Sequence, residues 1–210
     1  MSVNIPASKS VSDALLAAFS RTSTSIISDC LDRLPGVPLK PFHKIECTMA
    51  GTALTVKVAS GDNRAIHQAL ELLQPGQVLV VDGEGDVSRA LMGDIMAAIA
   101  EKRGAAGVVV DGAIRDLATI SKGAFPMFAR AGIHRGPYKN GPGEINIPIS
   151  IGGMIVSPGD IVVGDHDGVV AFPASQAESL LEQCLATERK EAEMMAQIAA
   201  GTYKGAYAAH

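Results

Sequence analysis

Residues 77–116 read QVLVVDGEGDVSRALMGDIMAAIAEKRGAAGVVVDGAIRD, and the rest of the chain is organised around this stretch. Its pattern predicts a strand over 78–82, a glycine-rich loop, a helix beginning at Asp94, a turn at Gly104 and a second strand over 108–111. The first strand is apolar until its last residue, which is typical of a strand that is covered on both faces. A strand–helix–strand unit of this kind indicates a mixed α and β fold.

The geometry of this unit predicts that three charged residues meet at one edge of the sheet. The helix, which Asp94 is expected to cap, carries the chain about 15 Å away, and the second strand brings it back. We therefore expect Arg115 and Asp116 to lie beside Asp94, at the carboxyl edge where crossover α/β units bind their ligands. The free N–H groups of Ile95 and Met96 at the helix start favour an anion. The alternative reading of these charges is a buried ion-pair network.

Composition predicts one globular domain over residues 1–210. The chain is 47% hydrophobic and 19% charged, which argues against disorder. Its net charge of −4 and the lack of a basic tract argue against nucleic acid as a partner. No apolar run approaches the roughly 20 residues of a membrane helix, and the N-terminus lacks a signal-peptide pattern. The cysteines do not have the CxxC spacing that is typical of zinc sites. We therefore expect a cytoplasmic protein that does not bind membranes.

The remaining segments supply further elements around this unit. Asn63 and His67 lie at the start of an expected helix and are candidate ligand contacts, although a single histidine is more often structural. Asp165, His166 and Asp167 are assigned to a hairpin turn rather than to a metal site. The expected elements are helices over 11–19, 23–34, 64–73 and 174–199, strands over 51–59 and 125–129, a long loop over 135–150 and a hairpin over 156–172. We expect the long C-terminal helix to pack on a neighbouring subunit.

The spaced signature Gly-Asp-x20-Arg-Asp runs from Gly93 to Asp116. Three other segments are informative together with it. These are GDNRAIHQAL at 61–70, RGPYKNGPGEINIPISIGG at 135–153 and PGDIVVGDHDGVVAFP at 158–173. Together they resemble the class II pyruvate aldolases that cleave 4-hydroxy-4-methyl-2-oxoglutarate, a family that also contains the RraA regulators of ribonuclease activity. The resemblance covers nearly the whole chain. It implies an RraA-type fold of layered β-sheets flanked by helices, akin to the swivelling phosphohistidine-type domains.

The resemblance also implies the activity of a lyase. The enzyme would cleave 4-hydroxy-4-methyl-2-oxoglutarate or 4-carboxy-4-hydroxy-2-oxoadipate through a pyruvate enolate, and it would decarboxylate oxaloacetate as a side activity. Such chemistry needs a clamp for the substrate carboxylate, and the guanidinium of Arg115 suits this role. Gly93, Asp94 and the helix N–H groups of Ile95 and Met96 are expected to complete the substrate site.

A divalent cation, Mg²⁺ or Mn²⁺, is the expected cofactor. By resemblance, Asp116 binds it directly and Asp94 acts through a water on the cation; this water is our candidate base. Mg²⁺ commonly takes only one or two protein carboxylates, so a sparse set of ligands suffices. The resemblance further implies a homotrimer or a homohexamer with sites at the subunit interfaces. There Glu191 of a neighbouring C-terminal helix is expected to join the site, with Glu188 as the second choice.

Two other functions remain open at this stage. One is a non-catalytic regulator that binds a ribonuclease or a helicase, but the long C-terminal helix and the retained Asp94 favour an enzyme. The other is a Schiff-base aldolase that uses Lys57 or Lys102, although no neighbouring residue explains a lowered lysine pKa. The sequence leaves open the natural substrate, the physiological metal and the identity of the catalytic base.

Overall fold

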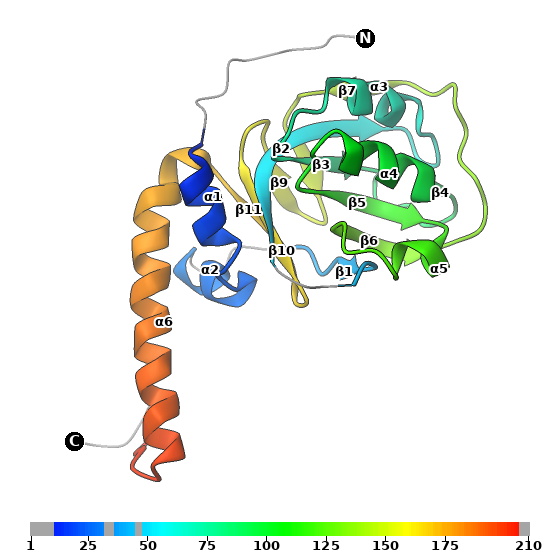
Figure 1. Ribbon diagram of the computed structural model, residues 1–210. Helices are drawn as coiled ribbons and strands as arrows, with labels where there is room; N and C mark the ends of the chain where they lie inside the picture. The colour runs from blue at the N-terminus through cyan, green and yellow to red at the C-terminus, as the bar shows by residue number, and fades with distance from the viewer. Residues whose placement is uncertain (1–10, 32–35, 45–47, 206–210) are drawn as a thin grey trace.

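The computed structural model describes residues 11–31, 36–44 and 48–205, and the expected strand–helix–strand unit lies at its centre (Figure 1). The unit comprises β3 (Gln77–Asp82), β4 (Ala90–Met92), α4 (Asp94–Lys102) and β5 (Gly107–Ile114). Strands β3 and β5 are parallel neighbours in the sheet, as the pattern predicts. Two details of the prediction are wrong. The second strand continues past Gly112 to Ile114, and the short strand β4 precedes the helix.

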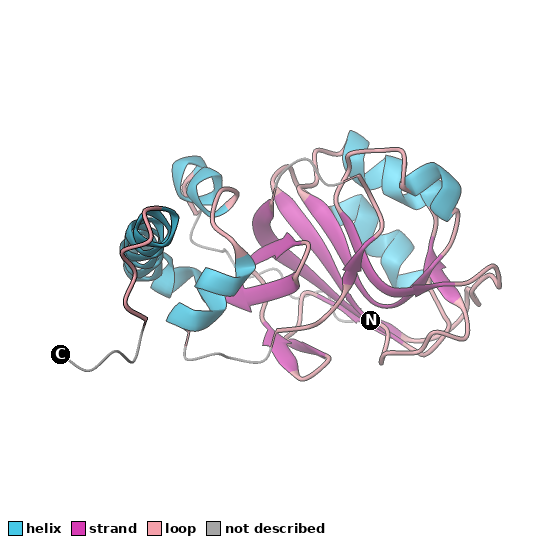
Figure 2. Ribbon diagram, turned by 90° about the horizontal axis from the view of Figure 1, so that it is seen from below, coloured by secondary structure: helices cyan, strands magenta, loops and turns pink. Residues whose placement is uncertain are grey.

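Within the described residues the main sheet has nine strands, and seven of them follow the order β1-β6-β5-β3-β2-β10-β11. Strand β4 pairs with β5, and β7 pairs with β2. The sheet curls strongly, which Figure 2 shows from below. The other strands of this sheet are β1 (Lys40–Pro41), β2 (Met49–Val58), β6 (Met127–Gly132), β7 (Gly143–Ile145), β10 (Ile161–Asp165) and β11 (Gly168–Phe172). A separate antiparallel pair consists of β8 (Ile149–Ile151) and β9 (Met154–Val156).

Helices lie on one face of the sheet and at one end of it (Figure 1). The helices besides α4 are α1 (Asp13–Phe19), α2 (Thr24–Cys30), α3 (Arg64–Leu72), α5 (Leu117–Ile120), η1 (Ala174–Gln176) and α6 (Ala177–Ala199). The hydroxyls of Ser12 and Ser23 cap α1 and α2. The second expected helix is shorter than predicted, because α2 ends at Cys30; positions 32–35 lie outside the described residues. No helix in the described part of the chain combines the length and the apolar composition that crossing a bilayer requires.

The central strands are buried on both faces, as their continuous apolar run predicts. Along β3, Leu79 and Val81 pack into the core under α3 and α4, whereas Val78 and Val80 pack into the core that β8 and β9 cover. Because side chains alternate along a strand, each of these strands contributes to both cores. The mixed α and β arrangement of sheets flanked by helices is therefore confirmed.

The hairpin expected over 156–172 forms from β10 and β11, with Asp165 opposite Gly168 in its register. The Asp165 carboxylate accepts hydrogen bonds from the backbone N–H and the hydroxyl of Thr24, at 2.8 and 2.7 Å. It also accepts the N–H of Asp167 at 2.9 Å. These bonds tie α2 to the hairpin, so Asp165 has a structural role.

The C-terminal helix α6 packs against α1 and α2 through its first half, where Leu180 and Cys184 are buried. Its second half extends beyond the body of the molecule (Figure 1). Met195 and Ile198 on this half are 64% and 52% exposed. The expectation that the helix packs on a neighbouring subunit stays a prediction, because the structure describes a single chain.

Candidate active site

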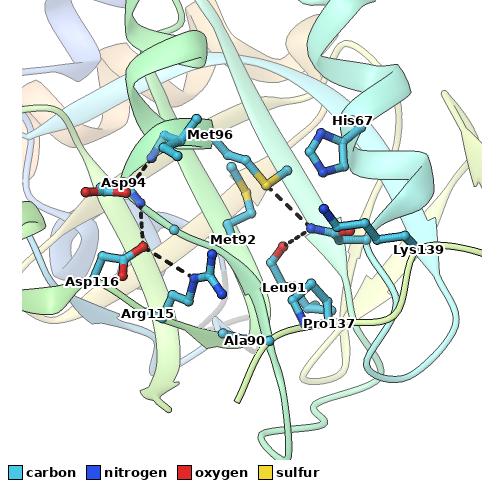
Figure 3. Close-up of a pocket in the computed structure, with 14 residues that line it drawn as sticks. His67, Ala90, Leu91, Met92, Asp94, Met96, Arg115, Asp116, Pro137 and Lys139 are labelled. Atoms are coloured by element: carbon cyan, nitrogen blue, oxygen red, sulfur yellow. Dashed lines mark hydrogen bonds and ion pairs between the residues drawn. The ribbon is translucent and has the colours of Figure 1, made fainter. Parts of the chain in front are cut away.

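A cavity of about 320 Å³ lies at the carboxyl edge of the central strands (Figure 3). Its walls come from the end of β4, the first turn of α4, the residues after β5, the start of α3 and the loop that follows β6. Asp94, Arg115 and Asp116 all line it, so folding brings together the three charged residues that the sequence places far apart. The volume is at the lower end of the roughly 300–1,000 Å³ that is typical of small-molecule pockets.

Asp116 is the residue through which the other two charged residues are connected. Its Oδ2 accepts the backbone N–H of Asp94 at 3.2 Å and lies 3.4 Å from Nε of Arg115. Its backbone is left-handed, with φ 62° and ψ 34°. That region is uncommon for residues other than glycine, although aspartate and asparagine adopt it more readily than most. This turn at the end of β5 directs the carboxylate toward the start of α4 (Figure 3).

Arg115 and Asp116 are not a buried ion pair. Their side chains are 45% and 35% exposed, so the two charges keep contact with solvent and with the cavity. An ion pair of this exposure contributes little to stability. The arrangement therefore fits a ligand site better than a structural salt bridge.

Gly93 is the point where α4 approaches Asp116 most closely. A Cβ atom at this position would lie 2.3 Å from Oδ2 of Asp116 and 3.2 Å from Nε of Arg115. Only a residue without a side chain leaves room for both groups. Gly93 is also the N-cap of α4 and has extended backbone angles that any residue can adopt.

If the chain catalyses the aldolase reaction that the sequence resemblance implies, we expect Gly93→Ala to lower its kcat/KM by roughly a hundredfold, because the new methyl group displaces the Asp116 carboxylate and the Arg115 guanidinium. The unfolding midpoint should change little, since the backbone is not strained. Gly123→Ala is the matched control, because its new Cβ would meet only the Ile120 carbonyl oxygen, at 3.7 Å. Steady-state kinetics and thermal unfolding of both variants test this expectation; equal activity of the two would contradict it.

The start of α4 differs from the prediction in one respect. Asp94 is the first helical residue rather than the N-cap, which is Gly93. Its Oδ1 accepts the N–H of Ile95 at 2.7 Å, so the N–H that the sequence left free at Ile95 is already bonded. The carboxylate of Asp94 on the first turn interacts favourably with the positive end of the helix dipole and partly neutralises it. Asp94 therefore moderates the attraction of this helix end for anions.

The opposite side of the cavity is formed by Asn63, His67 and Lys139. His67 and Lys139 lie together on the far side from Asp94 and Asp116 in Figure 3. Burial, and after it the nearby ammonium group of Lys139, lower the pKa of His67. Both effects favour the neutral form of the imidazole. The sequence indicates Asn63 and His67 as candidate ligand contacts but does not indicate Lys139. The one sequence feature that could have pointed to Lys139 is its place in the glycine- and proline-rich segment RGPYKNGPG.

Asp62 holds the loop that carries Lys139. Its Oδ2 accepts the N–H groups of Asn140 and Gly141 at 2.8 and 2.7 Å, and its Oδ1 accepts the N–H of Arg64 at 2.9 Å. Burial alone would raise the pKa of Asp62, but these three donors and the charge of Arg64 outweigh it, so the net effect lowers the pKa. The ionised carboxylate therefore joins the start of α3 to the loop.

The donor set around Asp116 fits a hard divalent cation such as Mg²⁺. The Asp116 carboxylate is partly exposed in the cavity. Its hydrogen bond with Asp94 and its ion pair with Arg115 both use Oδ2. In the described part of the chain, no three His, Cys, Asp or Glu side chains gather to hold a metal ion by themselves. Mg²⁺ commonly binds one or two carboxylates and keeps several waters, so the carboxylates of Asp116 and Asp94 would suffice to hold one ion in this cavity.

Glu191 and Glu188 lie on α6, on the other side of the molecule from the cavity (Figure 1). Glu191 is exposed and Glu188 is partly exposed. Neither belongs to the described lining of its own chain's cavity, so either residue would reach such a site only in another copy. Lys57 and Lys102 also lie outside that lining, which argues against Schiff-base chemistry there.

The fold and the cavity define an α/β protein with a candidate small-molecule site, in which one guanidinium and two carboxylates line the same cavity. The chain matches the family model described as RraA-like, Aldolase/RraA, over residues 24–171. A relative from Halalkalibacterium halodurans is 41% identical over 180 residues, which are 85% of this chain and 84% of the relative. The chain therefore belongs to the RraA-like family. That relative is provisionally named a 4-hydroxy-4-methyl-2-oxoglutarate aldolase, and other relatives carry the name of this enzyme too.

Solved structures agree with the fold. An uncharacterized protein from Pseudomonas syringae has a TM-score of 0.82 and 26% identity, and the match covers 95% of each chain. The RNA-processing inhibitor RraA from Thermus thermophilus has a TM-score of 0.66 and 33% identity, and the match covers 73% of this chain and 93% of that one. The RraA-type fold that the sequence resemblance implies is thus confirmed.

Proposed function

We propose that this protein is a divalent-metal-dependent aldolase, a lyase that cleaves a 4-hydroxy-2-oxo acid and releases pyruvate. The substrate class is that of 4-hydroxy-4-methyl-2-oxoglutarate or 4-carboxy-4-hydroxy-2-oxoadipate, and oxaloacetate decarboxylation is an expected side activity. The observation that carries the proposal is that Asp94, Arg115 and Asp116 line one cavity, where Asp116 contacts the other two. The enzyme names of several family members at 37–41% identity support a lyase that acts on a small molecule.

The residues of the cavity have distinct parts in this chemistry. The Arg115 guanidinium binds the carboxylate next to the 2-oxo group, and its planar fork fixes the orientation of the substrate. The first turn of α4 adds the positive end of its dipole, which the Asp94 carboxylate partly offsets. Asp116 would hold Mg²⁺ or Mn²⁺, which when bound polarises the 2-oxo oxygen and stabilises charge on the departing pyruvate enolate. Asp94 orients water beside the reacting hydroxyl group.

Pyruvate release in the presence and absence of a chelator tests the proposal. With excess Mg²⁺ we expect pyruvate from 4-hydroxy-4-methyl-2-oxoglutarate, loss of at least about 99% of the rate in EDTA, and recovery when Mg²⁺ or Mn²⁺ is restored. Pyruvate can be followed by its NADH-dependent reduction to lactate. Oxaloacetate is the second substrate to test. Failure of both substrates to yield pyruvate in excess metal would refute the proposal.

The second candidate function is that of a non-catalytic regulator of RNA processing. The similarity to the solved RNA-processing inhibitor RraA favours it. A ribonuclease or a helicase would then be the partner. Stoichiometric binding of a purified ribonuclease by a protein that releases no pyruvate would establish this function in place of the first.

We further propose a cytoplasmic homotrimer, or a pair of trimers, in which Glu191 of a neighbouring α6 completes each cavity. The exposed second half of α6 and the position of Glu191 away from its own cavity support this arrangement. Glu188 is the alternative contributor.

A further inference from the structure

We propose that Asn63, His67 and Lys139 form a distal subsite, which binds the end of the substrate that carries the 4-hydroxyl group and a second carboxylate. This inference rests on the proposed function, and it concerns the part of the cavity that the chemistry at Arg115 and Asp116 does not use. The subsite would select oxo acids with two carboxylates over those with one.

Asn63 supplies the first line of support. Its side chain is 3% exposed, and its amide Nδ2 donates to the carbonyl oxygen of Leu91 at 3.0 Å and contacts Sδ of Met96 at 3.5 Å. These two acceptors fix which end of the amide is the nitrogen. The buried Oδ1 then has no hydrogen-bond partner among the described residues. A buried acceptor without a partner is costly. Because Asn63 lines the cavity, a ligand hydroxyl that reaches its side-chain amide would supply the missing donor.

Lys139 supplies the second line of support. It lines the same cavity as Arg115 but lies on the other side, next to His67 (Figure 3). The cavity thus carries a cationic side chain at each side, with Arg115 beside Asp94 and Asp116 on one side and Lys139 on the other. A substrate with a carboxylate at each end matches this distribution, and a pyruvate-sized ligand would use only one side.

The loop that carries Lys139 is held in place before a ligand binds. Arg89 donates to the carbonyl oxygen of Gly136 at 2.8 Å and to the Tyr138 hydroxyl at 2.7 Å. Its guanidinium also lies 3.9 Å from the centre of the Tyr138 ring, which is a cation–π contact. Asp62 binds the two N–H groups that follow Lys139. Because the backbone is ordered on both sides of Lys139, binding a carboxylate costs little loop entropy.

Substitution of Lys139 by glutamine separates this subsite from the reaction centre. The test compares cleavage of 4-hydroxy-4-methyl-2-oxoglutarate with cleavage of 4-hydroxy-2-oxopentanoate, which has the same reacting bond but no distal carboxylate. In Lys139→Gln we expect kcat/KM to fall roughly tenfold or more for the dicarboxylate and to change less than about twofold for the monocarboxylate. Lys122→Gln, which removes an exposed lysine outside the cavity lining, is the matched control and should leave both values unchanged.

A binding measurement makes the test independent of turnover. Calorimetric titration with Mg²⁺ present compares 2-oxoglutarate with 2-oxopentanoate, which have equal chain length and neither of which is cleaved. We expect the wild-type protein to bind 2-oxoglutarate more tightly and Lys139→Gln to lose this preference, while both proteins bind pyruvate equally.

The outcomes distinguish the two proposals. A preference for 2-oxoglutarate that depends on Lys139, in a protein that releases no pyruvate, would support the distal subsite and refute the aldolase. Pyruvate release with an equal effect of Lys139→Gln on both substrates, or with no effect, would refute the distal subsite and leave the aldolase standing.

Discussion

The Asp116→Asn variant is expected to lose pyruvate release by at least about a thousandfold and to lose its response to Mg²⁺ as well. Asparagine has the same shape and tolerates the left-handed backbone at this position. It can still accept the N–H of Asp94, so the local fold should survive. What it lacks is the negative charge that would hold the proposed divalent cation and that pairs with Arg115. The substitution therefore removes the negative charge of residue 116 while it keeps the shape of the side chain and the local fold.

Two measurements check this expectation. Calorimetric titration with Mn²⁺ should show a site in the wild-type protein and none in Asp116→Asn, and kinetics at saturating Mg²⁺ should show the lost turnover. Asp167→Asn, which removes an exposed carboxylate from the β10–β11 hairpin, is the matched control and should behave as the wild type. Metal-stimulated turnover that persists in Asp116→Asn would show that the cation binds elsewhere.

The Arg115→Ala variant is expected to raise KM for the oxo acid about a hundredfold and to lower kcat as well, because the substrate loses both its carboxylate partner and its orientation. Arg115→Lys should recover only part of the loss, since an ammonium group keeps the charge but not the two-pronged hydrogen bonding. The unfolding midpoint should move little in either variant, because the side chain is 45% exposed.

Substrate-dependence curves for the two Arg115 variants, together with their thermal unfolding, test this assignment. Binding of Mn²⁺ should be retained in both, which distinguishes loss of the substrate clamp from loss of the metal site. An unchanged KM in Arg115→Ala would mean that another group, such as Lys139, binds the carboxylate next to the 2-oxo group.

The sequence predicts the part of the fold on which the site depends, because local patterns determine that part. An apolar run, a helix with clear start and stop signals and a second apolar run predict β3, α4 and β5. The crossover then brings Asp94 to Arg115 and Asp116 on general topological grounds. The segments that resemble the family add the expectation of the layered sheet arrangement, which the solved relatives confirm.

Other features depend on contacts between residues far apart in the chain, and local patterns do not encode them. The three-residue strand β4 exists because it pairs with β5 at Ala90 and Met92, and a segment of this length has no recognisable period. The left-handed turn at Asp116 has no glycine to mark it. Lys139 enters the cavity only because Asp62 and Arg89 anchor its loop.

The triple hydrogen bonding of Asp62 has a consequence for how selectivity arises. One carboxylate joins the segment that bears Asn63 and His67 to the segment that bears Lys139, so the same residue holds these two parts of the wall in place. The pKa of Asp62 is lower in the folded protein than in the unfolded chain. The stability that the ionised carboxylate contributes is therefore fully present above the pKa of the unfolded chain. It is lost as the pH falls through the pKa of the folded protein. Near neutrality Asp62 is therefore ionised and its three hydrogen bonds are in place, so the proposed subsite would already be assembled when a substrate arrives.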